Sequence, residues 1–237
     1  MRDPSCAGWL ARATGVHVYA GEVAADRTDK LFLVGALTVA AALEDPAVVA
    51  AWDTPSVLEE QLVSGLAGHL ARGSVWVVAD YVSAGIPNAP VDFASAASYF
   101  AAASSFAGPA NHRAVRERGA AVASVGAEQL ARTLRDRIAE LEQILAGAPA
   151  EQLISVIGRR VMYLSDYLAT RIVEQAVHLD DLARSVGVEP SSWPLPPGHV
   201  TLAVEVGIET AILRAGEVQV LRALYRGGFA EAALPVL

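Results

Sequence analysis

Apolar residues recur every three or four positions along most of the chain, a spacing that is typical of amphipathic helices. No segment alternates for long between apolar and polar residues, so the pattern predicts an all-α protein. The period is clearest in residues 128–145, where five apolar residues share one helical face: Leu130, Leu134, Ile138, Leu141 and Leu145. The predicted helices span residues 28–44, 56–84, 93–106, 111–145, 158–186 and 199–226.

Residues that interrupt or cap helices mark the ends of these segments. Pro46 ends the first helix, and Ser56 with Glu59 has the spacing of a capping box for the second. Gly126 divides the fourth helix, and the three prolines of residues 193–197 form a stiff connector before the last. We predict an N-terminal arm, a four-helix bundle with an additional short helix, and a linker with a C-terminal helix packed on the bundle, over residues 1–27, 28–187 and 188–237.

Composition decides between a soluble and a membrane protein. The chain has 237 residues, 53% of them hydrophobic and 19% charged, and its mean hydropathy is +0.36. Its longest apolar segment, residues 31–43, is shorter than the roughly 20 residues that a membrane helix needs. Residues 1–4 lack the basic start of a signal peptide, and the single Cys6 excludes a disulfide scaffold. We therefore predict a cytoplasmic protein with no membrane partner.

The charge balance limits the partners further. The net charge is −8, and no run of basic residues is present. Proteins that bind nucleic acid normally present a cationic face to the phosphates, so we predict no nucleic-acid partner. A small-molecule substrate is the partner that remains.

Glu174 and His178 lie one helical turn apart, and together they can bind one divalent metal. Asp181 stays on the same face, where its carboxylate could accept a hydrogen bond from the second ring nitrogen of His178. Arg171 and Tyr167 also share this face. The alternative is that these five residues, together with Ser185, form the solvated face of an ordinary amphipathic helix, and helical phase alone does not separate the two interpretations.

His69 falls on an apolar helical face beside Leu66 and Trp76. An imidazole in such a place is either a core histidine satisfied by hydrogen bonds or a ligand that points into an interior site. With Glu174 and His178 from a facing helix, it would complete a set of three protein ligands. Three ligands leave positions open for water or substrate, which is typical of catalytic metal sites.

Two motifs resemble the DinB-like metalloprotein superfamily, and within it the N-terminal domain of mycothiol-dependent maleylpyruvate isomerase. The first is Trp52-Asp-Thr-Pro55-Ser56 followed by Leu66-Ala-Gly-His69-Leu70, and the second is Glu174-x-x-Val177-His178-x-x-Asp181-Leu182. The segment Asn111-x4-Arg116 is a weaker match. The resemblance covers residues 28–187.

This resemblance implies a four-helix bundle that holds a divalent metal through His69, Glu174 and His178. Zinc is the usual metal of the superfamily, with iron and nickel as alternatives. The metal would lower the pKa of a bound thiol or water, and mycothiol is the thiol of the most similar branch. Mycothiol belongs to actinobacteria, and an Ala-rich composition with Lys30 as the only lysine suits such a source.

Five residues are predicted to contact the substrate near this site: Asn111, Arg113, Arg116, Arg171 and Tyr167. The first three could face the mouth of the site and hold an anionic substrate, and the alternative is that the two arginines among them are solvated. The mixed α/β domain that follows the bundle in the isomerase is replaced by about fifty residues after Val186, which form a linker, one helix and a tail. The resemblance therefore extends to the bundle and its metal site, and not to the substrate of the isomerase.

These observations predict a metal-dependent enzyme of small-molecule metabolism, either a mycothiol-type S-transferase or a thiol-assisted isomerase. A second hypothesis keeps the metal without the thiol, as a Lewis acid in a hydrolysis or in a tailoring step of specialised metabolism. Two histidines and one carboxylate are also the ligand set of non-haem iron, which adds oxygen chemistry to this second hypothesis.

A third hypothesis belongs to another class: a non-catalytic ligand-binding or interaction protein on the same bundle. The last predicted helix has an apolar stripe that could form a homodimer, or that could pack as a fifth core helix. Its members are Ile208, Ile212, Val218, Leu221 and Leu224.

Overall fold

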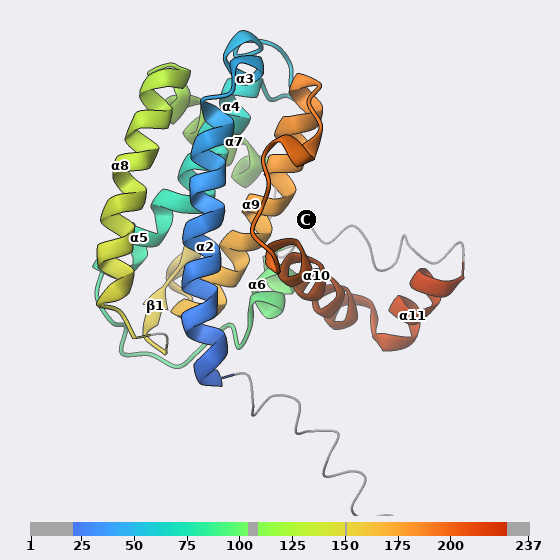
Figure 1. The fold of residues 1–237 in the computed structure, drawn as a ribbon. Helices are drawn as coiled ribbons and strands as arrows, with labels where there is room; N and C mark the ends of the chain where they lie inside the picture. Colours follow the sequence, from blue (N-terminus) through green and yellow to red (C-terminus); the bar gives the residue numbers. More distant parts are fainter. Residues whose placement is uncertain (1–20, 104–108, 150, 227–237) are drawn as a thin grey trace, which may run out of the picture.

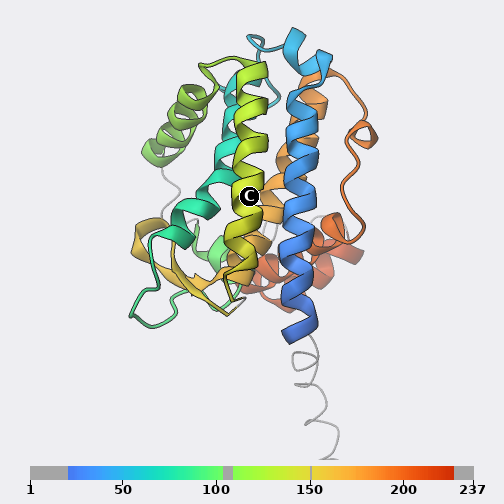
Figure 2. The ribbon, with the colours of Figure 1, turned by 60° about the vertical axis from the view of Figure 1, so that its left-hand side comes forward.

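The computed structural model describes residues 21–103, 109–149 and 151–226 of the chain. Four long helical segments stand side by side and form a bundle (Figure 1 and Figure 2). They are α2 (Gly21–Leu43), α4 (Val63–Ala71) with its continuation α5 (Val77–Ser83), α8 (Ala127–Ala146) and α9 (Leu164–Val186). The predicted all-α fold class is confirmed.

Aliphatic side chains from all four segments form the bundle core. The face of α8 that its helical spacing predicts is buried along its length, from Leu130 to Leu145. Phe32 of α2, Leu66 of α4 and Leu168 of α9 belong to the same buried cluster. Burial of each such side chain contributes roughly 1.5–3 kcal/mol. The cluster therefore fixes the positions of α4 and α9, the two helices that carry the predicted metal ligands.

Shorter elements surround the bundle. The short helix α3 (Pro46–Ala50), which the sequence pattern does not predict, begins where the side chain of Asp45 accepts a hydrogen bond from the backbone N–H of Ala47. The additional helix α6 (Ala96–Ala103) packs against α9, and α7 (Pro109–Ala123) packs against α4. An antiparallel hairpin of β1 (Leu153–Ser155) and β2 (Val161–Tyr163) precedes α9. The single turns η3 (Ile157–Arg159) and η4 (Pro190–Ser192) complete the connections.

The last predicted helix is two helices, α10 (His199–Ala215) and α11 (Glu217–Tyr225). Helix α10 packs against α6 and α9, whereas α11 extends away from the bundle (Figure 1). Val218, Leu221 and Leu224 are each more than half exposed. A fifth core helix would bury these side chains, so that interpretation of the stripe is wrong for α11.

Three predicted helix starts lie six or seven residues away from those of the structure. Helix α2 begins at Gly21, so residues 21–27 of the predicted arm are helical, whereas residues 1–20 lie outside the described residues. The capping box is wrong, because α4 begins at Val63. The Ser56 hydroxyl instead accepts a hydrogen bond from the backbone N–H of Leu58 and donates to the carbonyl of Gln61, which closes a turn in the preceding loop.

The third difference lies before α9, which begins at Leu164 and not at Gly158. Gly158 takes a φ of 67° in the loop of the β1–β2 hairpin, a left-handed conformation that glycine adopts without strain. The predicted break near Gly126 is confirmed, with a φ of 87°, and Gly216 at 84° divides α10 from α11 in the same way. Within the described residues, no helix is both long and apolar enough to cross a membrane.

Candidate metal centre

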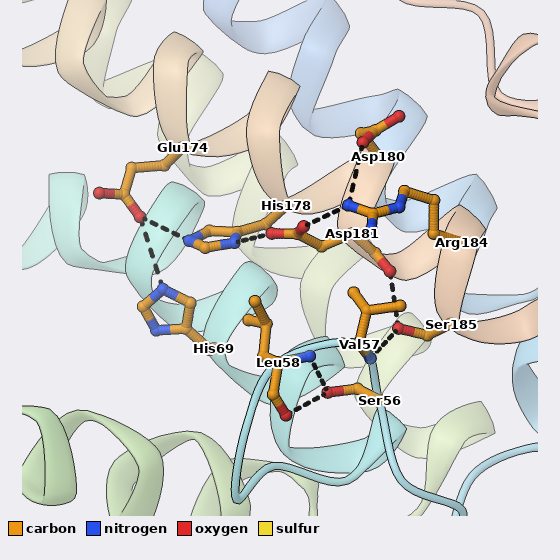
Figure 3. Close-up of polar contacts among 10 residues, drawn as sticks. All are labelled: Ser56, Val57, Leu58, His69, Glu174, His178, Asp180, Asp181, Arg184 and Ser185. Carbon is orange, nitrogen blue, oxygen red and sulfur yellow. Dashed lines mark hydrogen bonds and ion pairs between the residues drawn. The ribbon is translucent and has the colours of Figure 1, made fainter. Parts of the chain in front are cut away.

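The structure brings His69, Glu174 and His178 together between α4 and α9 (Figure 3). The Nε2 atoms of His69 and His178 each lie 3.4 Å from Oε2 of Glu174. One ligand atom from each residue falls within 4.8 Å of the other two. We call these three residues the donor set. Two imidazole nitrogens and one carboxylate oxygen at this separation fit a single divalent ion, and His2Glu sets hold zinc in catalytic sites.

The backbone around His69 makes room for its ring. Directly after α4 the chain widens into a π-helical turn, η2 (Arg72–Trp76), and such turns occur frequently at functional sites. A Cβ atom on Gly73 would lie 3.0 Å from Cε1 of His69, so glycine at this position leaves the imidazole free of contact. On the other side, α7 approaches closely at Gly119, where a Cβ would lie 3.1 Å from the backbone nitrogen of His69.

Asp181 orients His178, as the spacing on α9 predicts. The Oδ2 atom of Asp181 lies 3.0 Å from Nδ1 of His178, which leaves Nε2 of the imidazole facing Glu174 (Figure 3). The loop before α4 is tied to the same helix turn, because the hydroxyl of Ser185 donates to the carbonyl of Asp181 and accepts from the N–H of Val57. A carboxylate behind a histidine ligand fixes its tautomer and ring orientation.

Burial and charge set the protonation of the site. Burial alone would raise the pKa of Glu174, but the Arg171 guanidinium and the two imidazoles hold it well below its usual range. Glu174 is therefore an anion. Burial alone would lower the pKa of His178, but its contacts with Asp181 and Glu174 raise the pKa to about 9.

Two of the five predicted substrate residues are buried on α9, and the other three lie on α7, where two of them line the cavities next to the donor set. Tyr167 and Arg171 are buried, with 2% and 6% of their surface exposed, and Asp181 is also buried, so the solvated-face interpretation of this side of α9 is wrong. Asn111 lines the cavities next to the donor set. Arg116 lines one of them while it pairs with Glu60 at 2.7 Å. Arg113 is exposed and lines neither cavity.

Two cavities meet at the donor set. The inner cavity has a volume of about 210 Å³ and is lined by Arg171, by His69 and Glu174, and by three tyrosines. The outer pocket has a volume of about 550 Å³ and is lined by all three members of the donor set and by polar residues that include Gln61, Asn111 and His112. Both are lined by His69 and Glu174 as well as by Asn111 and Phe100, so the outer pocket reaches the same carboxylate as the inner cavity.

Several residues of the inner cavity are not predicted by any pattern in the sequence. Tyr81 and Tyr99 come from α5 and α6, outside both motifs, and no spacing in the sequence relates them to the donor set. Arg72 and Arg118 were missed as well. Arg72 follows His69 by three positions, so helical spacing could have found it.

Comparison with known protein families gives one match, which covers residues 34–183. The matching profile is that of the mycothiol maleylpyruvate isomerase N-terminal domain. The chain belongs to this family. The matched segment runs from α2 into α9 and contains the whole donor set, and the observed bundle agrees with the DinB-like fold of the predicted superfamily. Neither the curated proteins nor the solved structures gave a match.

Proposed function

We propose that the protein is a metal-dependent enzyme of small-molecule metabolism, an S-transferase or isomerase that uses a mycothiol-type thiol as its cofactor. The observation that carries the proposal is the donor set, assembled inside a bundle of the mycothiol maleylpyruvate isomerase N-terminal domain family and bordered by two cavities. The sequence resemblance favours zinc as the metal. A bound divalent ion would lower the pKa of a thiol or of water, which supplies a nucleophile at neutral pH.

The protein's own residues prepare the site for this role. Glu174 is held ionised beside Arg171, so its carboxylate is available as a ligand. His178 is fixed by Asp181, and His69 is held by the close approach of α7. Because these positions are set by buried contacts on two packed helices, little reorganisation is needed when a metal binds.

The two cavities suit a reaction between partners of different size. The outer pocket is the larger and borders all three members of the donor set, so it suits the bulkier thiol cofactor. The inner cavity is smaller and holds Arg171 beside Glu174, so it suits the second reactant. In this arrangement both reactants would reach the donor set from different sides.

The direct test is elemental analysis of the protein purified without chelator. We expect a single divalent ion per chain in the wild type, and a loss of at least about tenfold in retained metal for His69→Ala, Glu174→Gln and His178→Ala. His112→Ala is the matched control, because His112 is exposed and lines the outer pocket outside the donor set. Circular dichroism checks that each variant is folded. A wild type that neither carries nor takes up a divalent ion would falsify the proposal.

The thiol part of the proposal has its own readout. Added mycothiol should raise the melting temperature of the metal-loaded wild type, and the rise should disappear in His69→Ala. A protein that retains its metal but gives no shift with mycothiol would rule out the thiol cofactor and leave the thiol-independent hypothesis.

A further inference from the structure

A further cavity lies between α9, the linker that contains η4, and the first turns of α10. Its volume is about 740 Å³, which is larger than that of either cavity at the donor set. We call it the α9–α10 groove. The donor set lies outside it, and most of its walls are apolar, with contributions from Val177, Trp193, Leu195, Val200 and Val204.

The linker wall of this groove is held by two hydrogen bonds to the first part of the chain. The indole Nε1 of Trp193 donates to Oδ2 of Asp45 at 3.0 Å, and the hydroxyl of Thr38 donates to the carbonyl of Pro194 at 3.2 Å. Trp193 is buried, whereas the two valines of the α10 wall are each more than half exposed. The groove is therefore already formed in a single chain, and part of its apolar wall is left in contact with water.

Helix α11 has an apolar face that its own chain leaves exposed. Its buried residue, Val220, packs against α10. Val218, Leu221 and Tyr225 follow one another at spacings of three and four, so they share a different face of the helix, and each is more than half exposed. Because α11 extends away from the bundle (Figure 1), this face does not line the groove of its own chain. With the neighbouring exposed Leu224, we call these residues the α11 stripe.

The α11 stripe and the α9–α10 groove agree in size. Helix α11 has nine residues, a length of about 13 Å, and the groove follows α9 over residues 176–184, a stretch of the same length. A half-exposed side chain of this kind presents roughly 100 Å² to water, so the stripe and the two exposed valines of the groove supply roughly 600 Å² on each copy. Stable interfaces bury about 800 Å² on each partner, so these two surfaces provide most of what a dimer needs.

The two surfaces also carry opposite charge. Two carboxylates line the groove, from Asp180 and Asp181, against the single guanidinium of Arg184. Helix α11 and its C-cap reverse this balance, with Arg222 and Arg226 against a single glutamate. Opposite charges on facing surfaces steer association and fix the register of an interface. The occupant that fits the groove is therefore an apolar helix with a basic edge, and the chain itself carries such a helix.

We propose that the protein forms a two-fold homodimer in which α11 of each copy docks in the α9–α10 groove of the other. An amphipathic helix that lays its apolar face into an apolar groove is a recurring mode of recognition. Two-fold symmetry repeats the contact, so both stripes and both grooves are covered. The proposal does not depend on the proposed function. Its consequence for the site is that the second copy lies next to Asp181, the carboxylate that orients His178.

Direct packing of the two α11 stripes against each other is the competing arrangement. It also buries the stripe, but it leaves the groove open. Two substitutions separate the arrangements: Leu221→Lys places a charge in the stripe, and Val204→Glu places a charge in the groove. A dimer of stripe on stripe tolerates Val204→Glu, whereas the proposed dimer tolerates neither change.

The test measures the dimer dissociation constant by analytical ultracentrifugation from about 1 to 100 μM protein. We expect the wild type to dimerise within this range, and Leu221→Lys and Val204→Glu each to raise the dissociation constant by about tenfold or more. Val125→Glu is the matched control, because Val125 is 54% exposed, like Val204, and lies between α7 and α8, outside both surfaces. It should leave the constant unchanged.

An equimolar mixture of the two variants gives the sharpest result. In a mixed dimer one contact is that of the wild type, and in the other the introduced lysine of one copy faces the introduced glutamate of its partner. The mixture should therefore dimerise at concentrations where each variant alone is a monomer. Circular dichroism checks folding, and Leu224→Lys and Val200→Glu replace a variant that does not fold.

Each other outcome contradicts the proposal. A wild type that stays monomeric up to about 100 μM would show that neither surface binds a second copy. A dimer that Leu221→Lys disrupts and Val204→Glu does not would assign the interface to the two stripes alone. Two monomeric variants whose mixture is also monomeric would show that the stripe of one copy does not face the groove of the other.

Discussion

His199 gives the protein an acid sensitivity that can be calculated from its surroundings. Its side chain is fully buried where α2, α9 and α10 meet, and its Nε2 lies 2.9 Å from Oε1 of Gln175. The Nδ1 atom is buried without a hydrogen-bond partner among the described residues. Gly35 of α2 faces the same ring, and a Cβ there would lie 2.5 Å from Nε2. The imidazole therefore has no room for the water that would solvate a charge.

The size of the effect follows from the pKa. Burial lowers the pKa of His199 from 6.5 to about 4, so the folded protein keeps the ring neutral while the unfolded chain protonates it near pH 6.5. Between these two pH values the unfolded state binds one more proton than the folded state. The free energy of unfolding therefore falls by about 1.4 kcal/mol for each unit by which the pH decreases. Between pH 7.5 and pH 5 this group alone should remove about 2 kcal/mol of stability.

Urea unfolding of the wild type and of His199→Gln, at intervals from pH 7.5 to pH 5, isolates this contribution. Glutamine cannot titrate, so the difference in stability between the two proteins should change by about 2 kcal/mol over the range, in favour of the variant at low pH. His112→Gln is the control, because His112 is exposed on α7 and should leave the pH dependence of the wild type unchanged. Parallel curves for the wild type and His199→Gln would refute the reasoning.

Three further perturbations test other contacts. Gly119→Ala would place a Cβ 2.6 Å from the carbonyl oxygen of Gly65, so we expect a loss of about 1–3 kcal/mol and weaker metal retention, whereas Gly147→Ala, with no atom closer than 3.7 Å, should be neutral. Asp181→Asn should lower metal affinity about 10- to 100-fold in a competition assay, and Asp180→Asn, whose side chain is 52% exposed, should not. The exposed stripe of α11 keeps the homodimer as a prediction: light scattering should show a dimer that Leu221→Lys converts to a monomer, and a monomeric wild type would contradict it.

The bundle could be predicted from the sequence because local spacing and core burial agree there. The five apolar residues of α8 share one face in the sequence, and all five are buried. Boundaries were less predictable where a loop competes with a helix for the same residues. Ser56 has the hydroxyl and the spacing of a cap, yet that hydroxyl closes a turn with Gln61, and the helix begins seven residues later at Val63.

The donor set could be predicted from the sequence, whereas the inner cavity could not. Glu174 and His178 are related by one helical turn, so sequence alone could place them together, and His69 could be added through the family motif. The tyrosines of the inner cavity come from α5, α6 and α9, and only the packing of these helices brings Tyr81 and Tyr99 to Tyr167. No periodicity in one segment contains that information.

Burial decides between the two interpretations that helical phase left open for α9. A charged face on a surface helix and a charged face lining an interior site have the same spacing, because both follow the 3.6-residue period. They differ in what happens to the charges: a surface face keeps its water, whereas Arg171 is buried and the Glu174 side chain is only 12% exposed, so both charges must be compensated by other groups. Here the compensation is incomplete, since Nη2 of Arg171 lacks a hydrogen bond and the two imidazoles converge on one carboxylate oxygen. The convergence of both imidazoles on Oε2 of Glu174 therefore supports the proposal that a cation binds at this oxygen.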